Sequence, residues 1–147
     1  MDNPAISELN ALLKGEQMAI HAYDRFINGV EDIETKNQLK EFQADHKRHS
    51  ELLSKRIIEL GGQPQFGTGA AGMMASVKGM MEELGRRSTA DILKEAYDGE
   101  DKGIAAAEEV VKGDLDRESA QIVNEILTED HAHLREMSRL INKYEDS

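Results

Sequence analysis

Residues 39–60 read LKEFQADHKRHSELLSKRIIEL, and the pattern of this stretch indicates the fold class. Its apolar residues recur at steps of three and four, the spacing that puts side chains on one face of an α-helix. Two histidines, His46 and His49, occupy positions within that apolar series. A helix of this length buries its apolar face against other helices. The stretch therefore predicts a helical bundle with two imidazoles in its interior.

Three further stretches show the same periodicity, and each carries a polar residue at an interior position. The series before residue 30 contains Glu16, the series after residue 88 contains Glu100, and the last series contains Asp130 and His133. Strand signals are missing, because β-branched residues never cluster in alternation with polar ones. We therefore expect an all-α protein built from four long helices.

Capping signals mark where these helices begin. Asn3 precedes Pro4, Thr35 has capping-box spacing to Gln38, and Ser88 opens the third long helix. Residues 1–147 are expected to form one domain, an antiparallel four-helix bundle with a long connection between its second and third helices. A short, Met-rich extra helix is expected within that connection. The expected helices span residues 4–29, 34–60, 89–112 and 116–144, with the connector at 61–88.

The interior polar residues follow an internal repeat. Glu16 and His46 are 30 residues apart, and so are Glu100 and Asp130. In each pair the second residue is followed three positions later by a histidine, and a shift of 84 residues superposes the two pairs. Because each pair spans one helical hairpin, both hairpins should bring these residues to the same level. Each hairpin then supplies half of one site.

Six polar residues in one interior layer call for a shared cation. A buried, unpaired carboxylate is costly, whereas Fe, Mn and Zn ions accept oxygen and nitrogen ligands together. Two residues at i and i+3 lie on one helix face and can chelate one ion. A metal-free network, with each histidine paired to a carboxylate, is the alternative. The candidate metal ligands are Glu16, His46, His49, Glu100, Asp130 and His133.

Composition excludes several other classes of function. The 147 residues include no cysteine, so disulfide frameworks, Cys-ligated zinc sites and iron–sulfur clusters are ruled out. The net charge of −11 argues against nucleic acid and against an anionic membrane surface as partners. No apolar run is long enough for a membrane span, and the N-terminus has no signal-peptide pattern. A cytoplasmic location is the expectation.

The spacing of these residues resembles the ferritin-like superfamily, in the sense of bacterioferritin and rubrerythrin. That family places one Glu on each of two helices and a Glu-x-x-His motif on each of the other two. Glu16 and Glu100 match the single glutamates, and Tyr23 matches a tyrosine common near such sites. Both Glu-x-x-His motifs are altered, because His46 and Asp130 stand where the family has glutamate. The chain therefore resembles a branch of the family with a modified ligand set.

The resemblance implies a non-haem iron protein with a di-iron or modified di-metal site, or a single ion. Zinc and manganese are the alternative metals. The implied chemistry is iron oxidation, or reduction of oxygen or peroxide, with Tyr23 as a donor of a proton or an electron. Metal buffering without turnover and a structural dimerisation module with a relic site remain alternatives. A homodimer or higher homo-oligomer is expected.

Several other polar residues are expected to lie outside the ligand set. Asp45 and Glu129, which directly precede the two motif positions, are expected to be solvated. They are also the residues best placed to replace a missing carboxylate. His21 and His131 are expected at the surface or beside a ligand. Tyr97, one turn before the third helix's glutamate, is expected to fill the core or to reach the site.

Overall fold

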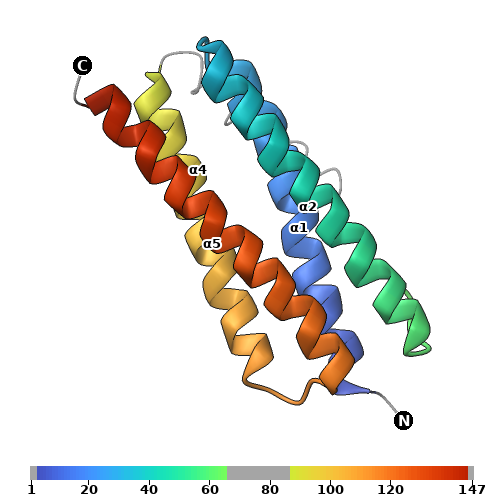
Figure 1. The fold of residues 1–147 in the computed structure, drawn as a ribbon. Coiled ribbons are helices and arrows are strands. Elements are labelled where there is room, and N and C mark those ends of the chain that lie inside the picture. Colours follow the sequence, from blue (N-terminus) through green and yellow to red (C-terminus); the bar gives the residue numbers. More distant parts are fainter. Residues whose placement is uncertain (1–2, 66–86, 146–147) are drawn as a thin grey trace.

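The computed structural model describes residues 3–65 and 87–145. The described helices lie side by side in a bundle, in which α1 packs on α2 and α4, and α5 packs on α4 and α2 (Figure 1). No strand occurs in the described ranges, so the expected all-α four-helix fold is confirmed. The expected extra helix of the connector falls outside the described residues. The helices are α1 (Pro4–Gly29), α2 (Ile33–Glu59), α4 (Thr89–Val111) and α5 (Arg117–Glu145).

Every packed pair of helices is antiparallel. In Figure 1, α1 and α5 run in one direction along the bundle, whereas α2 and α4 run in the other. The end of α2 and the start of α4 consequently lie at opposite ends of the molecule. Short turns join α1 to α2 and α4 to α5, so the chain forms two helical hairpins. None of the described helices is long and apolar enough to cross a lipid bilayer.

Polar side chains and glycine fix the helix ends. Asn3 caps α1 by accepting a hydrogen bond from the Ala5 amide at 2.9 Å. Asp32, rather than Thr35, caps α2, because its carboxylate accepts both the Thr35 amide and the Thr35 hydroxyl. At the other end of α2, Gly61 adopts φ 88°, a left-handed conformation that glycine reaches without steric cost. The Gly61 and Gly62 amides then close the helix on the carbonyls of the last turn.

The hydrophobic core is divided into two clusters, one toward each end of the bundle. The polar layer predicted from the sequence falls between them along the helices. The cluster toward the α1–α2 turn contains Tyr23, Phe26, Val30, Leu39, Phe42, Ile92, Leu93, Ala96, Met137 and Leu140. The cluster toward the α4–α5 turn contains Leu9, Leu13, Leu53, Ile57, Ile104, Ala107, Val123, Ile126 and Leu127.

Asp116 ties the start of α5 to α2. Its carboxylate accepts from the Ser119 amide at 3.1 Å and from the Ser119 hydroxyl at 2.6 Å, and it pairs with Arg56 at 2.6 Å. Burial alone would raise the pKa of Asp116, but the Ser119 and Arg56 contacts lower it to about 2. The carboxylate therefore stabilises the fold above its unfolded pKa of 3.8, and this contribution is lost as the pH falls toward 2.

Asp116→Ala should lower the free energy of unfolding at neutral pH by about 1 kcal/mol, the usual effect of losing a helix N-cap. Urea denaturation measures this loss of free energy of unfolding. Asp114→Ala is the control, because Asp114 is exposed in the same turn between α4 and α5. The difference between the two variants should shrink as the pH approaches 2. Equal losses in both variants at neutral pH would contradict a capping role for Asp116.

Candidate metal centre

All six predicted ligands meet in one buried layer of the bundle. They come from all four helices, and none of them exposes more than 8% of its surface. Each hairpin supplies three of them, as the 84-residue repeat predicts. The layer consists of Glu16 from α1, His46 and His49 from α2, Glu100 from α4, and Asp130 and His133 from α5.

The His46 imidazole lies at the centre of the layer. Its Nδ1 is 2.6 Å from Glu16 Oε2, and its Nε2 is in close contact with Glu100 Oε1. One ring thus connects carboxylates that belong to two different hairpins. Burial alone would lower the pKa of His46, but its contacts with Glu100 and Glu16 hold that pKa well above 6.5. In the metal-free layer His46 is therefore an imidazolium that links two carboxylates.

Glu100 is the most heavily contacted carboxylate. Its Oε1 accepts a hydrogen bond from the Tyr23 hydroxyl at 2.7 Å and lies 3.2 Å from His133 Nδ1. Burial opposes ionisation, but His133 and His46 lower the pKa of Glu100 to about 2. Burial and the charge of Glu100 raise the pKa of Tyr23 well above 10. Tyr23 is therefore a neutral phenol that keeps its proton beside the site.

Asp130 lies between the two motif histidines. Its Oδ1 is 3.6 Å from His133 Nδ1 and 3.9 Å from His49 Nδ1. Burial raises the pKa of Asp130 to about 7, and the nearby charge of Glu100 adds to this shift. Without a cation, two carboxylates in this part of the layer therefore disfavour each other's ionised form.

Three donor atoms of the layer are left without a partner. His49 Nδ1, Glu100 Oε2 and Asp130 Oδ1 are buried and form no hydrogen bond within residues 3–65 and 87–145. Each unsatisfied buried polar atom costs about 1–3 kcal/mol, and more when it is charged. Imidazole nitrogen and carboxylate oxygen are both ligands of first-row divalent metals. The donor set thus fits a metal ion, because an ion would satisfy atoms that the protein leaves unmatched.

A second set of carboxylates lies just outside the layer. Asp45 Oδ2 is 2.8 Å from His133 Nε2, and Glu129 Oε1 is 2.9 Å from His49 Nε2. Arg48 contacts both carboxylates. By accepting from Nε2–H, each carboxylate can fix the tautomer in which the Nδ1 lone pair faces the interior. The expectation that Asp45 and Glu129 are merely solvated was therefore wrong.

A signal for this outer pair is present in the sequence. Asp45 and Glu129 are themselves 84 residues apart, so they belong to the same repeat as the ligands. Arg48 has no such signal, because the shift pairs it with Ala132. Its role becomes visible only when α2 and α5 are seen to pack together.

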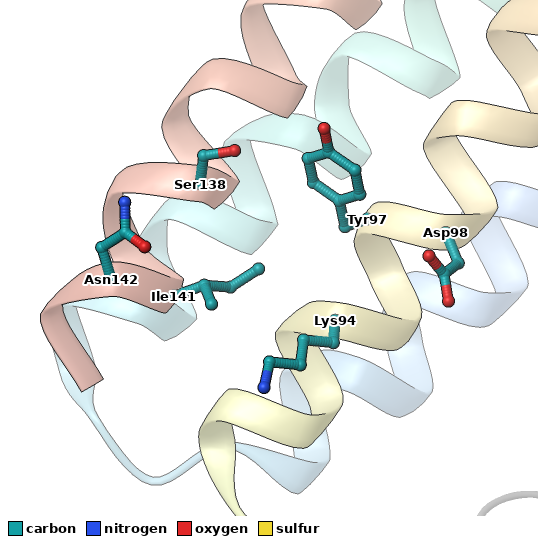
Figure 2. A pocket seen from close by; sticks show the side chains of 6 residues that line it. All are labelled: Lys94, Tyr97, Asp98, Ser138, Ile141 and Asn142. Atoms are coloured by element: carbon teal, nitrogen blue, oxygen red, sulfur yellow. The ribbon is translucent and has the colours of Figure 1, made fainter. Parts of the chain in front are cut away.

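The remaining candidates lie away from the layer. The His131 side chain is 48% exposed and lies 3.6 Å from Glu108, and His21 is also exposed. Tyr97 packs partly against the core and lines a surface depression between α4 and α5 (Figure 2). No histidine lines that depression, and it has only one carboxylate, so it is not a candidate metal site. Its lining is Lys94, Tyr97, Asp98, Ser138, Ile141 and Asn142.

Solved structures show the same fold at low sequence identity. A two-domain protein from Anabaena variabilis, which contains DJ-1/ThiJ/PfpI-like and ferritin-like domains, matches with TM-score 0.80 at 17% identity. The match covers 97% of this chain and 37% of that one. A dodecameric thioferritin, the bacterioferritin-related protein of Bacteroides fragilis, matches with TM-score 0.77 at 21% identity over 97% of this chain and 86% of its own.

A bacterioferritin and a family model complete the comparison. The Desulfovibrio desulfuricans bacterioferritin, whose structure describes a diiron site, matches with TM-score 0.75 at 24% identity over 97% of this chain and 80% of that one. No curated protein matches the chain. The model of the family described as "Domain of unknown function (DUF2383)" matches residues 4–113. Because that range is most of the sequence, the chain belongs to the DUF2383 family, and its fold is that of the ferritin-like superfamily.

Proposed function

We propose that this protein binds iron, as a first-row divalent metal, in the buried layer and uses it in oxidoreductase chemistry. The reaction would be oxidation of iron or reduction of oxygen or peroxide. One observation carries the proposal: two buried carboxylate oxygens of the layer, Glu100 Oε2 and Asp130 Oδ1, form no hydrogen bond within the described residues. A purely structural core gains nothing from such atoms, since apolar replacements are often neutral or stabilising.

The protein's own side chains supply binding, orientation and proton control. Asp45 holds Nε2 of His133 and Glu129 holds Nε2 of His49, which directs the Nδ1 of each ring into the layer. The two apolar clusters exclude water from either end of the layer. Tyr23 keeps a proton on its hydroxyl, hydrogen-bonded to Glu100, where a reduced oxygen species would need one. A bound Fe(II) ion would supply one electron on becoming Fe(III), so the two-electron reduction of one peroxide would consume two Fe(II) ions.

Metal content and turnover test the proposal in two steps. Wild-type protein purified without added metal should contain Fe, Mn or Zn. The control variant Glu108→Gln should contain the metal too, because the Glu108 carboxylate is exposed on α4, the helix that carries Glu100. Glu100→Gln should contain little. After iron loading, Tyr23→Phe should keep its metal but reduce peroxide roughly 100-fold more slowly, because it lacks a positioned proton donor.

The alternatives predict different results. Metal without turnover would favour buffering or storage, and protein indifferent to every metal would leave a structural module with a relic site. The proposal also includes one ferritin-like domain over residues 1–147, assembly into a homodimer or larger homo-oligomer, and a cytoplasmic location. Among the relatives by fold, the Bacteroides fragilis protein is described as dodecameric. Light scattering measures the assembly.

A further inference from the structure

The donors of the layer divide into two groups that share one residue. Within each group the ligand atoms lie within 4.8 Å of one another. The smaller group contains Glu16, His46 and His49, and the larger contains His46, Glu100, Asp130 and His133. His46 presents Nδ1 to the smaller group and Nε2 to the larger. The number of ions in the layer therefore depends on whether the His46 imidazole can bind a metal ion in both groups.

A neutral imidazole has one lone pair for a metal and one N–H. If Nε2 binds an ion, Nδ1 keeps its hydrogen and can donate it to Glu16 Oε2, which lies 2.6 Å away. A glutamate at position 46 would instead offer two equivalent oxygens, one to each side. With histidine instead of glutamate at position 46, this position can therefore bind one ion rather than two.

The charges and the buried atoms without a hydrogen bond favour the Glu100 side of His46 as the position of the ion. That group contains two carboxylates, and each has a buried oxygen without a hydrogen bond, Glu100 Oε2 and Asp130 Oδ1. The Glu16 group contains one carboxylate. Its Oε2 already has His46 Nδ1 at 2.6 Å and His49 Nδ1 at 3.5 Å. A cation is therefore needed on the side of Glu100, whereas the Nδ1–H of His46 can satisfy Glu16 Oε2.

We propose that the layer holds one metal ion per chain, on the Glu100 side of His46. The inference rests on the proposed function and makes it more specific. Glu16 then orients His46 from behind, in the manner of the carboxylate–histidine–metal arrangements of other proteins. His49, whose Nε2 is held by Glu129, stays outside the coordination sphere. The four donors are His46 Nε2, Glu100, Asp130 and His133 Nδ1.

Cobalt(II) titration of the full chain tests this inference. The visible absorbance of bound Co(II) and elemental analysis after gel filtration should both give one ion per chain. Glu16 and Glu100 are equivalent in the 84-residue repeat, so Glu16→Gln and Glu100→Gln form a matched pair. Glu16→Gln should still bind one Co(II), with affinity lowered at most about 10- to 100-fold, as expected for a residue behind a ligand. Glu100→Gln should abolish stoichiometric binding.

A second matched pair of variants keeps the test valid if a variant of the first pair fails to fold. His49→Gln should keep one Co(II) with a nearly unchanged spectrum, whereas His133→Gln should change the spectrum and weaken binding more strongly. Circular dichroism with chelator checks that each variant is helical. Two Co(II) ions in the wild-type chain, or equal losses within each pair, would overturn the single-ion inference and leave the proposed function standing. Failure of the wild type to bind Co(II), Fe(II) or Zn(II) would overturn both.

Discussion

Replacing His46 by glutamate should raise the metal capacity of the chain from one ion to two. The substitution restores a carboxylate with two oxygens between Glu16 and Glu100, and it recreates a Glu-x-x-His motif with His49. The ferritin-like di-metal layout uses that motif on two helices. Elemental analysis and Co(II) titration measure the capacity. His46→Gln is the control, because its amide offers one acceptor oxygen rather than two.

The same substitution should weaken the metal-free protein. It removes the imidazolium between Glu16 and Glu100 and adds another buried carboxylate. Breaking a buried pair by removing one partner costs about 3–5 kcal/mol, so we expect a loss of that order in chelator. Added metal should restore most of it. A capacity that stays at one ion in well-folded His46→Glu protein would contradict the role assigned to position 46.

The pH dependence of stability should have opposite signs in the metal-free and metal-loaded protein. Without metal, the pKa of His46 is raised well above 6.5, so its contribution to stability is present below that value and lost as the pH rises. Asp130 acts in the same direction, since its pKa rises from 3.8 to about 7 on folding. Above pH 4.5, where Glu100 is ionised in both the folded and the unfolded chain, urea denaturation in chelator should therefore show stability falling up to the raised pKa of His46.

Bound metal reverses this trend, because protons and the ion compete for the same lone pairs. Free metal at a hundredfold excess over its dissociation constant should add about 2.7 kcal/mol to the free energy of unfolding. If that free metal concentration is then held constant while the pH is varied, the increment should grow as the pH rises, because the dissociation constant falls. Glu100→Gln should abolish it, and Glu108→Gln should not. Parallel curves with and without metal would argue for a metal-free polar network.

The fold was predictable because its signals are local. The apolar spacing of each helix and capping residues such as Asn3 and Ser88 act within one or two turns of chain. The six residues of the layer were predictable for a related reason. Two hairpins with equal spacing bring residues 30 positions apart to one level, so Glu16 and His46 must meet if the turn between them is short.

The contacts around the layer were not predictable in the same way. Which nitrogen of His46 faces which carboxylate depends on the rotation of α2 against α1 and α4, and no spacing rule fixes it. The role of Asp45 depends on the packing of α2 on α5, because its partner His133 is 88 residues away. Side chains next to a motif appear solvated in a helical projection until the neighbouring helix is placed.

The division of the chain into two hairpins makes the metal a reporter of assembly. The four proposed donors come from α2, α4 and α5, so the first hairpin supplies a single ligand and the second supplies three. Neither hairpin alone contains the complete set. If the chain were supplied as two separate pieces, spectroscopic detection of the fully ligated ion would count the pieces that have found each other, independently of their helical content.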